Sequence, residues 1–175
     1  MSFDKVQDEI IDLLSDDSEQ QFIFLTGAAG TGKTTLLERV KNQLSLKKMV
    51  VAPTGIAALN IGGTTINSAF RIGFETIPLI TKSKDPRFAK LLRNLELLII
   101  DEVSMVRAPM LDAISQSLQI HRNSEEPFGG IHVLACGDLF QLPPIIKVIF
   151  GTSVVATAVT IFAPCRAIPS LSYFL

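Results

Sequence analysis

Residues 22–35 read FIFLTGAAGTGKTT, and this stretch decides the fold. Its opening residues are apolar, which predicts a buried strand, and residues Gly27 to Thr34 match the pattern G-x-x-x-x-G-K-[ST] in full. Glycines at these positions let backbone N–H groups converge on phosphate oxygens, and the helix expected after the loop adds its positive N-terminus. A chance glycine turn would need neither that strand nor that helix. The stretch therefore predicts a nucleotide-binding unit of strand, loop and helix.

The residues of this loop have expected parts in binding ATP. The loop comprises Gly27, Ala28, Ala29, Gly30, Thr31, Gly32, Lys33 and Thr34. Lys33 would reach the β- and γ-phosphates, and the hydroxyl of Thr34 would ligate Mg²⁺. We therefore expect ATP as substrate and Mg²⁺ as its cofactor.

Apolar strands and helical patterns alternate along the rest of the chain. Short apolar runs predict strands at 21–26, 49–53, 96–101 and 132–138, and helical spacing predicts helices at 3–14, 54–61, 86–93 and 109–121. Strands that are apolar on both faces and alternate with helices belong to a mostly parallel sheet covered on both sides. The predicted fold class is therefore α/β, a three-layer sandwich around a central sheet.

Two further motifs follow predicted strands. The strand before Asp101 and Glu102 would place Asp101 near Mg²⁺, through water, and Glu102 near the water that attacks the γ-phosphate. Ser104 could be a helix cap or a site residue, and both interpretations stay open. The segment GDLFQLPP follows the last strand, and its Gln141 could hydrogen-bond a γ-phosphate. The sequence thus offers a phosphate loop, an acidic pair and a polar sensor.

Charge and cysteine content exclude several classes of protein. The 175 residues carry 16 Lys+Arg and 17 Asp+Glu, so binding of nucleic acid by bulk positive charge is excluded. Two cysteines are too few for a disulfide framework and indicate a reducing compartment. The uncharged run 148–163 is shorter than the roughly 20 apolar residues of a membrane helix. We expect no membrane segment.

Five segments carry a specific family resemblance: GAAGTGKTTLL, VVAPTGIAALNIGGTTINSAF, LLIIDEVSMV, PFGG and GDLFQLPP. In this order the chain resembles the PIF and RecD-like DNA helicases of superfamily 1B. The resemblance implies a RecA-like P-loop NTPase fold, of which the chain would be the first lobe only. It implies an ATP-dependent DNA helicase that couples ATP hydrolysis to 5′-to-3′ translocation on single-stranded DNA. Repair, recombination and telomere maintenance are the processes implied by the family.

The resemblance also assigns roles to individual residues. Asp101 and Glu102 would be the Mg²⁺ and hydrolysis pair, and Gln141 the γ-phosphate sensor. Gln7 would read adenine, with a plain helix-surface glutamine as the alternative. The residues that would contact single-stranded DNA are Pro53, Thr54, Gly55, Thr64, Thr65, Asn67 and Ser68. Many relatives have histidine where this chain has Asn67.

Residues 71–93 allow a check on DNA binding that is independent of the family. They carry six basic and two acidic residues, a local charge of +4, so they could follow a phosphate backbone or be an ordinary solvated surface. Phe70 and Phe74 could stack on bases, but we expect them to pack in the core.

The chain divides into three expected parts. Residues 1–20 would be an N-terminal helix, 21–146 the ATPase lobe, and 147–175 an apolar tail that is atypical of the family, either truncated or frameshifted, with an extra core strand as the alternative. The second RecA-like lobe, whose arginines stabilise the transferring phosphoryl group, would be missing. We expect little activity from the chain alone; a P-loop ATPase switch and an inert DNA-binding fragment remain as alternatives. The expected location is cytoplasmic in a prokaryote, and nuclear or mitochondrial in a eukaryote.

Overall fold

The computed structural model describes residues 3–16, 19–27, 30–73, 78–138 and 172–174. In this part of the chain, six strands form one sheet in the order β3-β2-β4-β5-β1-β6, and each neighbouring pair is parallel. The strands are β1 Phe22–Thr26, β2 Lys48–Ala52, β3 Thr64–Thr65, β4 Leu97–Ile100, β5 His132–Gly137 and β6 Ser172–Phe174. The α/β class and the parallel sheet predicted from the sequence are confirmed.

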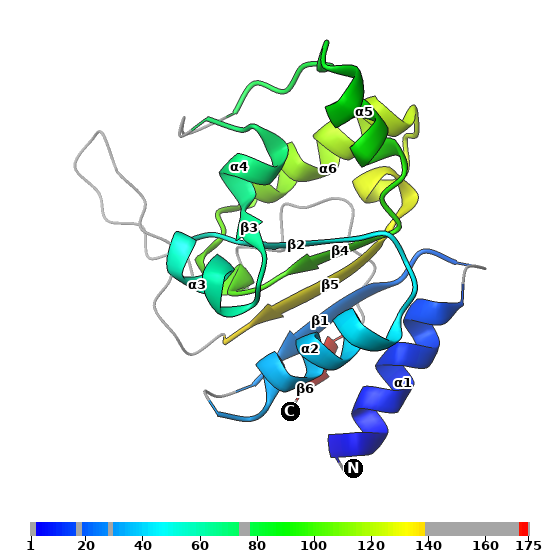
Figure 1. Cartoon of the computed structure of the whole chain (residues 1–175), viewed down its shortest axis with the longest axis vertical. Helices are drawn as coiled ribbons and strands as arrows, with labels where there is room; N and C mark the ends of the chain where they lie inside the picture. The colour runs from blue at the N-terminus through cyan, green and yellow to red at the C-terminus, as the bar shows by residue number, and fades with distance from the viewer. Residues whose placement is uncertain (1–2, 17–18, 28–29, 74–77, 139–171, 175) are drawn as a thin grey trace.

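Helices cover both faces of the sheet (Figure 1). They are α1 Phe3–Ser15, α2 Lys33–Gln43, α3 Gly55–Asn60, α4 Ile66–Phe70, α5 Pro86–Arg93 and α6 Ala108–Arg122, with 3-10 turns η1 Val103–Met105 and η2 Pro127–Gly130. Helix α5 has the predicted bounds, because Asp85 caps its first turn by accepting hydrogen bonds from the N–H groups of Arg87 and Phe88. The short elements β3 and α4 were not predicted.

Alternate residues of each strand enter two separate cores. On one side, Ile23 and Ile99 pack with α1 and α2. On the other, Phe22, Leu98 and Val133 pack with α4, α5 and α6. This alternation follows from the strand period of two and produces the three layers.

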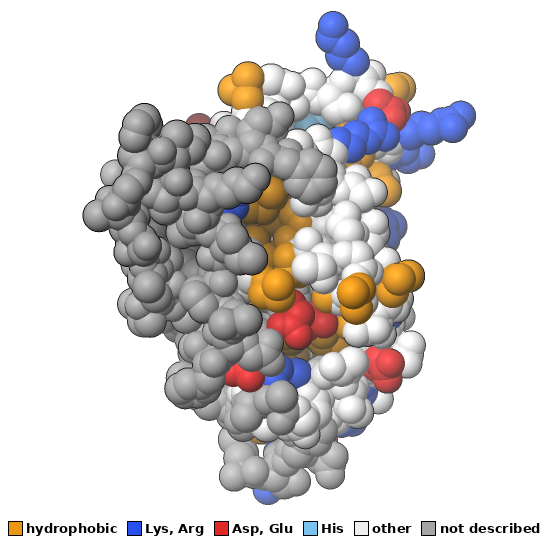
Figure 2. Space-filling model, turned by 90° about the vertical axis from the view of Figure 1, so that its left-hand side faces the viewer, with side chains coloured by type: hydrophobic (Ala, Val, Ile, Leu, Met, Phe, Trp, Pro, Cys, Tyr) orange, Lys and Arg blue, Asp and Glu red, His pale blue; other side chains and the backbone are white. Residues whose placement is uncertain are grey.

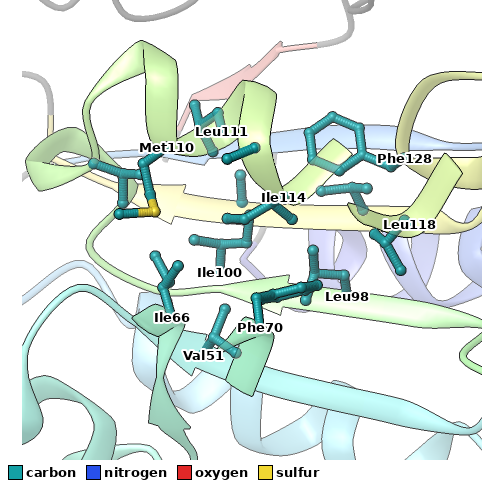
Figure 3. Packing of buried hydrophobic residues seen from close by; sticks show 14 of the residues in the cluster. Val51, Ile66, Phe70, Leu98, Ile100, Met110, Leu111, Ile114, Leu118 and Phe128 are labelled. Atoms are coloured by element: carbon teal, nitrogen blue, oxygen red, sulfur yellow. The ribbon is translucent and has the colours of Figure 1, made fainter. Parts of the chain in front are cut away.

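The second core is closed by aromatic and aliphatic side chains (Figure 3). Phe128 is fully buried, and its ring centroid lies 5.7 Å from that of Phe22. Phe70 is 3% exposed and packs in the same core, as expected from the sequence. Phe74 lies outside the described residues.

The end of the chain supplies a sixth strand. Ser172, Tyr173 and Phe174 pair with Phe24, Leu25 and Thr26 of β1. The run 148–163 lies outside the described residues. Among the residues that are described, no helix has the length and apolarity needed to cross a bilayer.

Candidate functional site

The predicted phosphate loop joins the end of β1 to the start of α2. Gly30 and Gly32 have φ angles of 82° and 90°, in the left-handed region that glycine adopts without steric cost. The N-cap residue of α2 is Gly32, which has no side chain to cap the helix, so the first N–H groups of α2 can bind an anionic ligand. Ala28 and Ala29 lie outside the described residues. The described part of the loop therefore has the conformation that a phosphate site needs.

Lys33 and Thr34 open helix α2. The Nζ of Lys33 donates a hydrogen bond to the carbonyl oxygen of Gly27, 2.6 Å away, so the ammonium group folds back over the loop. Thr34 is exposed to solvent. Both side chains are placed where a nucleotide phosphate can reach them.

Three carboxylates follow two neighbouring strands of the sheet, β4 and β5. Asp101 and Glu102 come after β4, and Asp138 comes after β5, where it is 5% exposed. The N–H of Asp101 donates to the carbonyl of Val51 at 2.9 Å, which extends the ladder between β4 and β2. Glu102 has a φ of 49°, a left-handed conformation that is costly for a residue with a Cβ. Asp138 was not singled out by the sequence analysis, because nothing local distinguishes it from other acids at strand ends.

These acids are electrostatically coupled to Lys33. Burial raises the pKa of Asp101, which the N–H of Glu102 and the charge of Lys33 partly offset. Burial and then the charge of Asp101 raise the pKa of Glu102; Asp138 raises it further, while Lys33 lowers it. The site therefore concentrates poorly solvated negative charge beside one lysine, at the carboxyl ends of the strands.

This donor set fits a hard cation. Mg²⁺ takes oxygen ligands and in nucleotide sites is held by one or two side chains together with phosphates and water. Asp101 and the Thr34 hydroxyl offer such oxygens, and a cation would favour the ionised carboxylates, which burial disfavours at both Asp101 and Glu102. In the described part of the chain, no group of three or more His, Cys, Asp or Glu side chains could hold a metal by itself.

Ser104 is neither a cap nor an exposed residue. It lies inside η1, is 3% exposed, and its Oγ has no hydrogen-bond partner. Gly137 allows β5 to approach it, since a Cβ at Gly137 would lie 3.0 Å from the Ser104 nitrogen. Of the two interpretations left open, the cap is wrong.

The segments expected to contact DNA meet beside the carboxyl end of β2. Residues 53–55 follow β2 directly, and Thr64 and Thr65 pair with Val51 and Ala52. The hydroxyl oxygens of Thr54 and Thr65 each cap a helix: they accept hydrogen bonds at 3.2 Å from the N–H groups of Ala57 and Ser68. The seven predicted residues are thus brought close together in the fold.

Asn67 has a structural partner of its own. Its Nδ2 donates to the carbonyls of Ile72 and Gly73, at 3.0 and 3.1 Å, and so ties α4 to the chain that follows it. A pocket of about 190 Å³ opens beside it, lined by Pro53, Ile66, Asn67, Met105, Val106, Arg107 and Met110. Arg107 adds a cation that no sequence motif indicated.

Figure 2 looks onto the carboxyl ends of the strands. Acidic side chains lie at the centre of this face, with a cationic side chain beside them and apolar side chains around them. The phosphate loop, the acidic pair and the DNA-contact segments therefore share one surface.

The remaining predicted site residues differ in their surroundings. Gln7 is 4% exposed, and its Oε1 accepts a hydrogen bond of 2.6 Å from Arg39 of α2, whose other nitrogen pairs with Asp8. It is therefore not a plain surface glutamine. Gln141 lies outside the described residues.

The basic segment 71–93 is only partly available to a ligand. The Arg71 guanidinium pairs with Asp85 at 2.8 Å and lies 4.3 Å from the centre of the Phe88 ring. The other five basic side chains of the segment belong to exposed residues: Lys82, Lys84, Arg87, Lys90 and Arg93.

Comparison with known proteins gives a consistent result. A family model described as PIF1-like helicase matches residues 2–162. The ATP-dependent DNA helicases PIF1 of Danio rerio and Homo sapiens are 43% and 41% identical to this chain over 129 and 131 residues, or 71% and 73% of it. RRM3 of Saccharomyces cerevisiae, also an ATP-dependent DNA helicase, is 37% identical over 81% of the chain. The chain spans about a fifth of the length of these relatives.

Solved structures agree in fold. Pif1 helicase from Bacteroides, in complex with ADP-AlF3 and single-stranded DNA, is 43% identical, with a TM-score of 0.75 over 84% of this chain and 34% of that one. Pif1 helicase from Candida albicans is 32% identical, with a TM-score of 0.73 over 100% of this chain and 39% of that one.

Proposed function

The chain belongs to the PIF1-like helicase family, and from this premise we propose that it is the ATP-binding lobe of a DNA helicase that moves 5′-to-3′ along single-stranded DNA. The observation that carries the proposal is the electrostatic coupling of Lys33, at the start of α2, to Asp101 and Glu102, which follow β4. In parallel sheets, ligands bind at this edge, next to the loops that follow the strands. The related Bacteroides helicase was solved with ADP-AlF3 and single-stranded DNA, which supports a nucleotide and single-stranded DNA as the two ligands of this chain.

Each group has a part in hydrolysis that follows from its position. The N-terminus of α2 and the Lys33 ammonium would bind the phosphate oxygens. Thr34 and Asp101 would hold Mg²⁺, the latter through water, and Mg²⁺ would neutralise charge on the phosphates. Glu102 would accept the proton of the attacking water, and its raised pKa makes its carboxylate a stronger base than that of an ordinary glutamate. Gln141 is proposed as the γ-phosphate sensor.

The DNA side is joined to the ATP side through β2. Val51 accepts the N–H of Asp101, and Thr64 is its partner on the other flank. A shift of Asp101 on nucleotide binding would therefore be transmitted to residues 53–55 and 64–68, which we propose contact single-stranded DNA. Gln7, held by Arg39 in the second half of α2, is proposed to read adenine.

Activity of these 175 residues by themselves should be low. Arginines that stabilise the transferring phosphoryl group can be worth about 10³–10⁵ in rate, and helicases of this class receive them from a second RecA-like lobe. We propose that the isolated 175-residue chain binds Mg·ATP weakly, hydrolyses it slowly and does not unwind DNA. Robust unwinding by the purified chain would contradict this.

The test is a titration with a fluorescent ATP analogue, followed by ATPase assays with and without single-stranded DNA. Lys33→Ala should remove most nucleotide affinity, because it deletes the ammonium beside the loop. Lys47→Ala is the matched control, since Lys47 is exposed and pairs only loosely with Glu96, at 3.7 Å. If single-stranded DNA changes neither the binding of nucleotide nor the turnover of ATP, the result would favour an ATPase switch. Failure to bind nucleotide at millimolar concentration would favour an inert DNA-binding fragment.

A further inference from the structure

The sheet has an open edge at the start of β2. Strand β3 pairs only with Val51 and Ala52. Lys48, Met49 and Val50 pair with β4 on one side, and on the other side no strand of the described chain reaches them. An unpaired edge of this kind is a template for another extended chain.

The backbone groups on that side can be assigned from the known bonds. The carbonyls of Lys47 and Val51 accept from the N–H groups of Leu97 and Asp101, so these residues face β4. Backbone groups of a strand point to alternate sides, so those of Lys48 and Val50 face away from β4. The Val50 carbonyl lies against Gly63, which leaves the backbone groups of Lys48 and the N–H of Val50 at the open edge. The edge thus presents main-chain donors and acceptors in the pattern of a strand that needs a neighbour.

A groove of about 580 Å³ runs beside this edge. Its floor is apolar, made by Met49, Val50, Ala69, Leu91 and Leu95. Leu91 is 48% exposed, so part of its side chain is open to a ligand in the groove. Glycine forms the wall next to Val50, since a Cβ at Gly63 would lie 2.5 Å from the Val50 oxygen. The groove can therefore take an apolar side chain from a segment lying along β2.

The rim of the groove is cationic. Lys47 and Lys48 line it, although the Lys48 ammonium donates to the carbonyls of Lys41 and Leu44 at the end of α2. The Lys41 ammonium reaches the wall at Gly62 and donates to the Ile61 carbonyl. Among the ion pairs of the described residues, the acid that pairs with one of these lysines is Glu96, 3.7 Å from Lys47. Lys90 and Arg93 are exposed on α5, directly before Leu91 and directly after Leu92. A partner that carries acidic side chains would complement this rim.

The groove is separate from the ATP site, and it meets the proposed DNA-contact segment at Thr64, which is one of its lining residues. It lies at the amino end of β2, whereas the phosphate loop and residues 53–55 follow carboxyl ends, and parallel strands keep these ends on opposite edges. An occupant would not compete with nucleotide.

We propose that the open edge of β2 binds an extended, acidic segment of another protein, which adds a strand beside Lys48 and Val50 and places an apolar side chain against Leu91. Main-chain pairing would supply affinity, and the groove and lysines would supply specificity. Nucleic acid fits the cationic rim but offers neither a strand-like backbone nor an aliphatic side chain for the floor. The inference does not depend on the helicase activity.

The test uses the whole chain and a fluorescent octapeptide of alternating glutamate and valine, blocked at both ends. We expect saturable micromolar binding, with the largest amide shifts in ¹⁵N NMR spectra at Lys48 and Val50. The same peptide with lysine in place of glutamate should bind about tenfold or more weakly, as should a version N-methylated at alternate residues. ATP should leave the affinity unchanged.

Two variants with the same chemical change decide the location. Leu91→Asp should weaken binding at least about tenfold, because it puts a carboxylate on the groove floor facing an acidic peptide. Leu79→Asp, at a residue 89% exposed and outside the groove, should change it less than about twofold. No binding at millimolar peptide, equal binding of the lysine peptide, or shifts confined to other residues would overturn the proposal. Displacement of the peptide by oligothymidylate would assign the groove to nucleic acid.

Discussion

Replacing Glu102 with glycine should stabilise the lobe while it abolishes ATP turnover. Glu102 has a φ of 49° and a ψ of 40°, and a left-handed conformation costs a residue with a Cβ about 1–2 kcal/mol. Glycine escapes this cost but gives up about 0.5–1 kcal/mol of unfolded-state entropy. The net backbone gain should be about 0.5–1 kcal/mol, or a rise in melting temperature of about 1–4 °C for a domain of this size.

A second gain comes from the charge and depends on pH. Because burial and Asp101 raise the pKa of Glu102, the ionised side chain costs folding free energy at neutral pH. Below the unfolded-state pKa the carboxyl is protonated in both states, and this cost is absent. It appears as pH rises through the folded-state pKa. Glu102→Gln should therefore stabilise the lobe at pH 7 and leave it nearly unchanged at pH 3.

The two variants separate backbone from charge. Both remove the carboxylate, so the difference between glycine and glutamine reports the strain alone and should not vary with pH. Urea unfolding without nucleotide or Mg²⁺, at pH 7 and pH 3, measures this difference in the free energy of unfolding. Glu126, which has a φ of −64°, is the control, since glycine there should be neutral or destabilising. If glycine at 102 is the less stable variant by about 1 kcal/mol, the argument from strain is refuted.

Three further predictions concern catalysis and packing. Glu102→Gln should keep the affinity for a fluorescent ATP analogue and stop residual hydrolysis, because the proton acceptor is lost; unchanged phosphate release would remove Glu102 from that role. Arg122→Met should lower the free energy of unfolding by about 2–3 kcal/mol, because the guanidinium donates at 2.6–2.8 Å to the carbonyls of Gly129, Arg93 and Leu95; a urea midpoint like that of the unmodified chain would contradict this. Phe128→Ala should cost about 3–5 kcal/mol by the same measurement, since the ring is fully buried, and a loss below about 1 kcal/mol would mean that the core closes over the cavity.

Local signals account for the elements that were predicted correctly. Helix α5 could be placed because Asp85 and Pro86 are a cap and a first-turn residue whose preferences act within one turn. The buried strands were recognisable from their apolar runs. Strand β3 was missed because its two residues are a strand only through pairing with Val51 and Ala52.

Features of the site that depend on tertiary structure could not be predicted. The entry of Asp138 into the acidic cluster depends on β5 lying between β4 and β1, an order that chain sequence does not reveal. The left-handed backbone of Glu102 is imposed by the turn into η1, since glutamate has no local preference for it. The sequence could therefore place Asp101 and Glu102 together at the end of a strand, but not the approach of Asp138, the raised pKa values or the strain at Glu102.

The proposed link between the ATP side and the DNA side would have a consequence for genetics. It consists of main-chain groups: the N–H of Asp101, the carbonyl of Val51, and the pairing of Val51 with Thr64. Every amino acid except proline supplies these groups, so an alanine scan leaves the link intact. Selection can therefore vary side chains along this route without uncoupling the two sides. Chemical synthesis of an ester in place of the amide at Asp101 would delete the bond and isolate its contribution.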